Sequence, residues 1–198
     1  MCTIEKSAVI DFFNVCAPSW DAETVRSERI IHCILDNAAV REGSRVLDVA
    51  CGTGVLIPDY LKRNAASVTA VDISPNMIDI AKRKFTHESV RFLCCDAESA
   101  EVGTDFSAII VYNAFPHFSN GAHLIARLAD FLAPGGILTV AHGMSRAALD
   151  QHHAGSARKV SAGLMPAEQM ADIFQRFLEV TTVISDDEMY QVCGRRRG

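Results

Sequence analysis

The chain has 198 residues, of which 49% are hydrophobic and 22% charged, and its formal net charge is -5. This composition excludes a largely disordered chain, and the length predicts a single domain over residues 1–198 with its own core. The negative charge argues against a nucleic-acid partner, and no apolar run is long enough to cross a bilayer, so we expect no membrane partner.

Residues 1–40 are predicted to be helical and to cover the rest of the domain as a lid. The segment Thr24–Asn37 has the apolar spacing of an amphipathic helix. The aromatic residues Phe13 and Trp20 precede it, and we expect them to line a substrate site beneath the lid. Packing of the lid helices is the alternative interpretation of these two side chains.

After residue 40, short apolar runs rich in β-branched residues alternate with amphipathic stretches. The predicted strands are Arg45–Val49, Ser67–Asp72, Val90–Cys94, Phe106–Tyr112, Ile137–His142, Phe177–Ser185 and Glu188–Cys193. The predicted helices are Leu56–Asn64, Pro75–Phe85, Ala122–Leu132 and Pro166–Arg176. Alternation of this kind predicts an α/β fold, a parallel sheet with helices on both faces.

Turn residues set the boundaries in the second half of the chain. Pro134, Gly135 and Gly136 are predicted to stop a helix before the next strand begins. The acidic turn at Asp186 and Asp187 leaves no room for a crossover, so the last strand should run antiparallel.

The segment 143–165 interrupts the alternation and is predicted to be a small cap insertion after the fifth strand. Ser145 is a predicted N-cap of a helix that carries His152 and His153. In open α/β folds, ligands bind at the carboxyl ends of the strands. We therefore expect the cap to lie over the active site together with the lid.

The first chemical motif is the loop Asp48-Val49-Ala50-Cys51-Gly52-Thr53-Gly54, where a predicted strand ends and a helix begins. Glycine lets a ligand approach the main chain closely, and a strand–loop–helix corner of this kind binds nucleotides or amino-acid groups. The loop lacks the full dinucleotide fingerprint and the lysine of a P-loop, which argues against NAD and ATP. A tight turn without a ligand is the alternative interpretation.

Acidic residues follow the next two strands. Asp72 ends the second strand, where a carboxylate can accept hydrogen bonds from both ribose hydroxyls; a helix cap is the alternative. Ser74 comes two residues later and is a predicted N-cap. Asp96 follows the third strand and can accept a hydrogen bond from an adenine amino group.

In this order and spacing, the motifs resemble those of the class I S-adenosylmethionine-dependent methyltransferases, particularly the ubiquinone- and menaquinone-biosynthesis type. The likeness extends over residues 40–142, and it departs from the family at Ala50, where glycine is common. The resemblance implies a Rossmann-like three-layer sandwich with a seven-stranded, mostly parallel sheet and an antiparallel last strand. It also implies S-adenosylmethionine as the cofactor.

The resemblance implies a set of cofactor-binding residues: Asp48, Ala50, Cys51, Gly52, Gly54, Asp72, Ile73, Met77, Asp96, Ala97 and Asn113. Asp48, Gly52 and Gly54 match positions at the methionine end of the cofactor. Asp72 and Met77 match positions at the ribose and the adenine edges, and Asp96 with Ala97 matches the adenine site. Asn113 matches a position near the sulfonium.

Methyl transfer needs alignment of the reactants and, for oxygen or nitrogen acceptors, removal of a proton. Histidine suits that task near neutral pH, and the predicted catalytic residues are His117, His142 and His152. Phe115 and His153 are predicted to contact the substrate, together with the aromatic residues of the lid. The expected acceptor is a small, partly apolar molecule.

Alternatives remain open at this point. His117, His142, His152 and His153 can instead hold a divalent metal, which would give a metal-assisted enzyme on a methyltransferase scaffold, although no compact ligand motif is present. A non-catalytic nucleoside-binding protein and a methyltransferase with a protein acceptor are further alternatives. Neither the methylated atom nor the oligomeric state, monomer or homodimer, follows from the sequence.

The cysteines carry a separate expectation. Their number is seven, and the chain opens without a signal peptide. An odd count without a signal predicts free thiols in a reducing, cytoplasmic environment.

Overall fold

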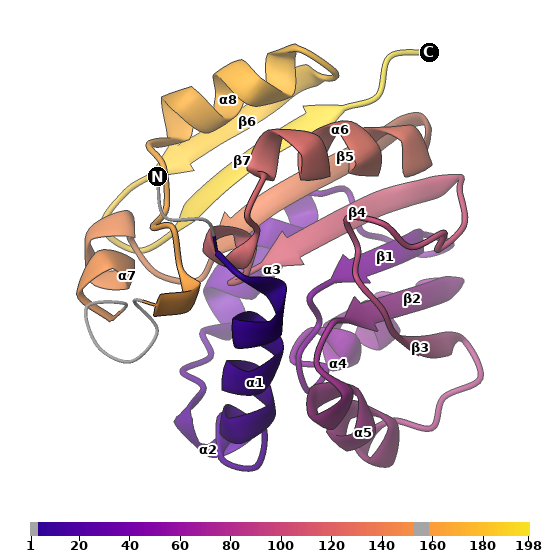
Figure 1. The fold of residues 1–198 in the computed structure, drawn as a ribbon. Coiled ribbons are helices and arrows are strands. Elements are labelled where there is room, and N and C mark those ends of the chain that lie inside the picture. The colour runs from indigo at the N-terminus through magenta and orange to yellow at the C-terminus, as the bar shows by residue number, and fades with distance from the viewer. Residues whose placement is uncertain (1–3, 153–158) are drawn as a thin grey trace.

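The computed structural model describes residues 4–152 and 159–198, and within these ranges a seven-stranded sheet forms the centre of the molecule (Figure 1). The strand order is β3-β2-β1-β4-β5-β7-β6. The strands are β1 (Arg45–Val49), β2 (Ser67–Asp72), β3 (Val90–Cys94), β4 (Phe106–Tyr112), β5 (Leu132–His142), β6 (Glu179–Ser185) and β7 (Tyr190–Arg195). Strands β1 to β5 run parallel, and β7 is antiparallel to both β5 and β6. The predicted sheet with a reversed last strand is confirmed.

Helices cover both faces of this sheet. On one face pack α3 (Glu28–Asn37), α4 (Ile57–Lys62) and α5 (Pro75–Lys84). On the other face pack α6 (Gly121–Phe131) and α8 (Ala167–Gln175) (Figure 1). Because side chains alternate along a strand, Ile110 packs into the first layer while Ile109 and Val111 pack into the second. The predicted three-layer sandwich is confirmed.

The remaining short helices gather at the carboxyl-terminal edge of the parallel strands. They are α1 (Lys6–Cys16), α2 (Trp20–Glu23), the 3-10 helix η1 (Phe115–His117) and α7 (Arg146–His152) (Figure 1). The first two belong to the predicted lid and α7 to the predicted cap. In the described ranges, none of the helices combines the length and the apolar character that a bilayer crossing requires.

Two predicted helix caps are present. The Ser74 hydroxyl accepts a hydrogen bond from the Met77 amide at 3.2 Å, at the start of α5. The Ser145 hydroxyl accepts one from the Ala148 amide at 3.2 Å, at the start of α7. Each hydroxyl satisfies an amide that the first turn of a helix leaves without a partner.

One predicted boundary is wrong. Pro134, Gly135 and Gly136 do not separate α6 from the following strand, because β5 already begins at Leu132, directly after the helix. The ladder with β4 shifts register there, and Gly135 adopts a φ of 76°. Two backbone hydrogen bonds to Arg196, of 3.0 and 2.8 Å, join the segment to the chain that follows β7. Because Arg196 lies far along the chain, its hydrogen bonds to Gly135 and Gly136 place these residues in the strand, although their sequence favours a turn.

Candidate functional site

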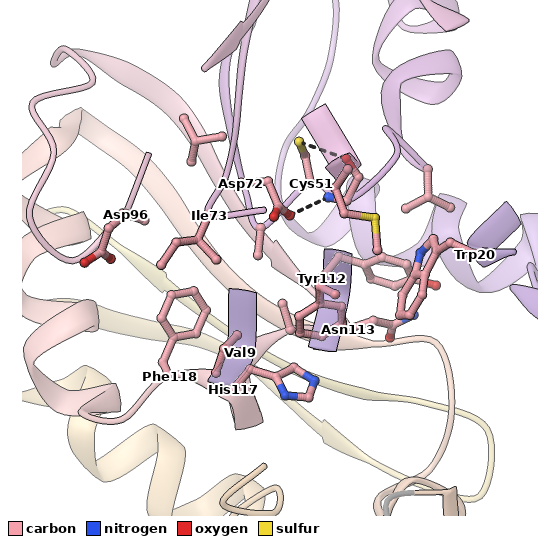
Figure 2. A pocket seen from close by; sticks show the side chains of 18 of the residues that line it. Val9, Trp20, Cys51, Asp72, Ile73, Asp96, Tyr112, Asn113, His117 and Phe118 are labelled. Atoms are coloured by element: carbon pink, nitrogen blue, oxygen red, sulfur yellow. Dashed lines mark hydrogen bonds between the residues drawn. The ribbon is translucent and has the colours of Figure 1, made fainter. Parts of the chain in front are cut away.

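A cavity of about 340 Å³ lies at the carboxyl-terminal edge of the sheet, under the lid (Figure 2). Its walls come from the loops after β1, β2, β3 and β4, from α1 and α2, and from the start of the cap. The predicted site residues that line it are Phe13, Trp20, Ala50, Cys51, Gly52, Asp72, Ile73, Met77, Asp96, Ala97, Asn113 and His117. Segments distant in sequence thus meet around one space.

The glycine loop has backbone conformations that favour glycine. Gly52 and Gly54 have φ values of 55° and 86°, and Ala50 has a φ of 56°. Ala50 therefore adopts a left-handed conformation that is strained for a residue with a Cβ, which explains why glycine is common at this position in the family. Gly54 lies behind the wall, where an added Cβ would be 2.8 Å from the Phe85 ring.

Asp72 ties the first two loops together. One carboxylate oxygen accepts a hydrogen bond from the Gly52 amide at 2.8 Å (Figure 2). The other accepts one from the Ser74 amide at 2.8 Å. Burial raises the pKa of Asp72, while these two amide donors oppose that rise. Each carboxylate oxygen can accept a second hydrogen bond, so the group can still receive hydroxyl donors from the cavity.

Asp48 lies behind the glycine loop, fully buried beside Tyr60. Burial and the neighbouring Asp72 carboxylate raise the pKa of Asp48 to about 7, against the opposing influence of the Tyr60 hydroxyl. Asp48 is absent from the cavity lining, whereas Ala50, Cys51 and Gly52 of the loop form part of the cavity wall.

Asp96 occupies the opposite side of the cavity from Trp20, with Asp72 and Ile73 between them in this view (Figure 2). It accepts a hydrogen bond from the Glu98 amide at 2.9 Å and pairs with the Lys6 ammonium at 2.6 Å. Burial alone would raise the pKa of Asp96, but the hydrogen bonds from Lys6 and Glu98 hold it below its usual value.

His117 reaches the cavity from η1, beside Val9 of the lid (Figure 2). Its Nδ1 lies 2.7 Å from the carbonyl oxygen of Val160. Since a carbonyl only accepts, Nδ1 donates, and the neutral ring then has an unprotonated Nε2. The ring stands edge-on to Phe13 at 4.9 Å, and Phe13 in turn stands edge-on to Trp20 at 5.6 Å.

Residues 46–136, which contain the glycine loop, Asp72, Asp96 and His117, match a family described as methyltransferase domain. The chain contains a methyltransferase domain. The match begins in β1 and ends in β5, so it covers the strands that build the cavity but neither the lid nor the hairpin.

Two curated relatives agree with this assignment. A malonyl-[acyl-carrier protein] O-methyltransferase of Acetivibrio thermocellus is 32% identical over 138 residues, which are 68% of this chain and 49% of that protein. A ubiquinone biosynthesis O-methyltransferase of Xanthomonas campestris is 32% identical over 130 residues, 60% of this chain and 53% of that protein. The chain spans about half the length of these relatives. The predicted resemblance to such enzymes is confirmed.

Solved structures share the fold of the whole described chain. A chain in the complex between the Haloferax volcanii Trm112 methyltransferase activator and a methyltransferase superposes with a TM-score of 0.79 at 18% identity, covering 96% of this chain and 98% of that one. The N-methyltransferase NodS of Bradyrhizobium japonicum, in complex with S-adenosylhomocysteine, gives 0.72 at 15% identity, covering 98% and 99%. These similarities establish the Rossmann-like methyltransferase fold.

Two predicted site residues lie away from the cavity. His142 is fully buried at the end of β5, with its ring 6.1 Å from that of Tyr190, so it does not reach the described cavity wall. Phe115 packs in the core against Gly121, where an added Cβ would be 2.4 Å from its ring. His142 ends β5 and Phe115 begins η1 shortly after β4, but the packing directs both side chains inward.

The cap histidines stay predictions. His152 ends α7, but its side chain lies outside the described residues, as does all of His153. Leu149 of the same helix lines the cavity, so α7 itself borders the site. Among the described residues, no group of three or more His, Cys, Asp or Glu side chains is placed to hold a metal ion.

Several residues that line the cavity were not predicted. They include Lys6, Val9, Thr24, Glu98, Tyr112, Met144 and Leu149. Tyr112 is the last residue of β4 and directly precedes Asn113, so its position at a strand end is a sequence signal for a place in the cavity wall. Lys6 gave no such signal, because its partners Asp96 and Glu98 lie some ninety positions along the chain.

Proposed function

We propose that this chain transfers a methyl group from S-adenosylmethionine to a small-molecule acceptor, releasing S-adenosylhomocysteine. The observation that carries the proposal is a single cavity that joins the glycine loop, Asp72 and Asp96. When bound, the cofactor supplies an electrophilic methyl carbon. The backbone of the glycine loop allows close approach of the amino-acid group of the cofactor, and the Asp72 and Asp96 carboxylates can accept hydrogen bonds from its ribose and adenine groups. The residues that line the cavity therefore fit this cofactor.

In this proposal, the methyl donor lies along the loops at the ends of β1, β2 and β3. Ala50, Cys51 and Gly52 contact the methionine end, with Asp48 and Gly54 holding the loop from behind. The other proposed contacts are Asp72, Ile73 and Met77 for ribose and the adenine edges, Asp96 and Ala97 for adenine, and Asn113 near the sulfonium. This orientation puts adenine on the Asp96 side of the cavity (Figure 2).

The acceptor side is built from His117 and aromatic residues. Phe13, Phe118 and Tyr112 line the cavity near His117, which suits a small, partly apolar acceptor. The Val160 carbonyl holds the imidazole so that Nε2 can take the proton from the nucleophilic atom. His117 is therefore our proposed general base, and His152 and His153 remain proposed contacts from the cap.

The proposal extends to the organisation of the protein. We infer one domain over residues 1–198, with a cap at 143–165. Of the predicted lid over residues 1–40, α1 and α2 lie over the cavity, whereas α3 packs on a face of the sheet. The described cysteines are free thiols, which supports a reducing, cytoplasmic environment.

Titration calorimetry with S-adenosylhomocysteine tests the donor, and tritium transfer from labelled S-adenosylmethionine to a panel of phenols, carboxylic acids and amines tests the acceptor. His117→Gln should lower kcat by about 10²–10⁴-fold, because it removes the base, and leave the donor Kd nearly unchanged. The exposed His123→Gln is the matched control. Absence of binding of either nucleoside would refute the donor; an unchanged kcat in His117→Gln would refute the base.

A further inference from the structure

Carboxylates outnumber cations in the wall of the cavity. The acidic residues that line it are Glu23, Asp72, Asp96 and Glu98, and among the described lining residues the single lysine or arginine is Lys6. The Lys6 ammonium lies 2.6 Å from an Asp96 oxygen and 2.7 Å from a Glu98 oxygen. Its charge is therefore shared between two carboxylates, and the wall keeps an excess of negative charge.

Two further cations lie close to the lining segments, and both are already paired. Arg26, which follows the lining residue Val25, donates to the buried Asp59 carboxylate. The Lys84 ammonium lies 2.7 Å from the carboxylate of Asp21. An anionic acceptor would thus enter a cavity whose described wall has no uncompensated cation, whereas a cationic acceptor would meet uncompensated carboxylates.

Glu23 is the carboxylate placed to meet an incoming acceptor. It ends α2 and is exposed, yet it lines the cavity together with Thr24 and Val25, so these three residues border the opening. In the part of the chain that the structure describes, no cation pairs with the Glu23 side chain. Val25 is 85% exposed, so an apolar surface borders the opening beside this carboxylate.

Aromatic rings line the same cavity. The Phe13 ring stands edge-on to those of Trp20 and His117, with centroids 5.6 and 4.9 Å away, and Tyr112 and Phe118 also line the cavity (Figure 2). The face of an aromatic ring attracts a cation and also packs against apolar groups. Together with the carboxylate at the opening, these rings suit a cationic group on an apolar body.

We infer that the acceptor is an amine with an apolar body, and that Glu23 selects for its positive charge at the opening of the cavity. The inference rests on the proposed function, because it names the acceptor of that reaction. The ammonium group first gives one proton to Nε2 of His117. The nitrogen lone pair then forms the bond to the methyl carbon, while the carbon–sulfur bond breaks and its electron pair stays on sulfur. A positive charge thus passes from sulfur to nitrogen inside a cavity whose carboxylates favour it on either atom.

Three probes with the same phenyl body test the preference for charge: phenethylamine, phenethyl alcohol and hydrocinnamate. Titration calorimetry measures their binding to the protein saturated with S-adenosylhomocysteine. We expect the amine to bind about tenfold more tightly than the carboxylate, with the alcohol between them, because attraction of the cation and repulsion of the anion both contribute. Tritium transfer from labelled S-adenosylmethionine should also be fastest to the amine.

Glu23→Gln keeps the shape of the side chain and removes its charge. The Kd of the amine should rise by about two- to fivefold, as suits an exposed pair, whereas the Kd of the alcohol should stay unchanged. Salt should weaken amine binding in the wild type more than in Glu23→Gln, because salt screens the pair. Glu42→Gln is the matched control, since it removes an exposed carboxylate just before β1, at the edge of the sheet opposite the cavity.

The outcomes separate the two proposals. If the protein binds neither S-adenosylmethionine nor S-adenosylhomocysteine, the proposed function and the amine acceptor both fail. If it binds them, but the amine does not bind or binds no more tightly than the carboxylate, the amine acceptor is refuted and the donor site stands. An equal loss of all three probes in Glu23→Gln would mean that Glu23 shapes the opening without selecting charge, which refutes its proposed role.

Discussion

Two glycines with the same backbone handedness make different demands on the fold. Gly54 and Gly43 have φ values of 86° and 81°. An added Cβ at Gly54 would lie 2.8 Å from the Phe85 ring and 3.1 Å from Ile57, whereas at Gly43 it would meet nothing within 4 Å. Gly43 is therefore needed for its backbone alone, and Gly54 also for the close approach of α5 to the glycine loop.

The first stability prediction compares alanine at these two positions. Gly43→Ala should cost about 1 kcal/mol, the strain of a left-handed alanine. Gly54→Ala should cost about 2–4 kcal/mol, because the overlap with Phe85 adds to the same strain. Urea unfolding at one pH measures both, and equal losses would show that the Phe85 contact is unimportant.

For single residues, the sequence predicts which side chains line the cavity better at the proposed donor end than at the proposed acceptor end. Asp72 and Asp96 follow strands directly, so local order along the chain already brings them to the same edge of the sheet. His142 also ends a strand, but β7 pairs alongside β5 and directs its ring toward Tyr190 in the core. That pairing involves residues some fifty positions away, and no local pattern announces it.

At the scale of elements, one buried ion pair fixes the end of the lid to α4. Arg26 donates two hydrogen bonds to the Asp59 carboxylate, at 2.7 and 2.6 Å, and a third to the Val55 carbonyl at 2.8 Å. The Asp59 side chain is only 1% exposed. Removing the arginine would leave a buried carboxylate without its counter-charge.

We therefore expect Arg26→Ala to destabilise the fold by about 2–4 kcal/mol. Arg29→Ala removes the exposed pair with Glu188 and should cost less than about 0.5 kcal/mol. Thermal and urea unfolding of both variants provide the comparison. A loss in Arg26→Ala as small as that in Arg29→Ala would mean that water replaces the guanidinium at Asp59.

Helices and strands were predicted correctly where their own apolar pattern determines them. Strands β1 to β4 have the predicted bounds, and the helices differ at their ends by a few residues. The segment Pro134-Gly135-Gly136 was misjudged, because its hydrogen bonds go to Arg196 at the other end of the chain. Turn residues describe local backbone preference, and a pairing partner far along the chain can override that preference.

At the scale of the whole molecule, a buried acid gives the stability a pH dependence. The pKa of Asp48 is about 7 in the fold, above the 3.8 of a free aspartate, because burial and Asp72 disfavour the charged form. The folded chain thus holds a proton that the unfolded chain releases. This contribution to stability is full below pH 4 and is lost as the pH rises through 7.

Between pH 5 and pH 8, the wild type should lose about 1–3 kcal/mol more stability than Asp48→Asn, which has no proton to lose. All other ionisable groups are the same in both proteins, so the difference isolates Asp48. Urea unfolding at several pH values in this range measures it. Parallel stability curves for the two proteins would mean that Asp48 ionises normally in the fold.

The place of β7 has a consequence for how the chain is made. It lies between β5 and β6, although it follows both in sequence, and β6 pairs with β7. During synthesis, α8 and β6 therefore emerge before β7, the strand that joins β6 to the sheet. Until then, the apolar side chains of Met170 and Phe174 lack the part of their core cluster that β7 supplies. The loops proposed to bind the donor belong to strands completed earlier. We expect the nascent chain to be most vulnerable to aggregation and proteolysis just before its last strand arrives.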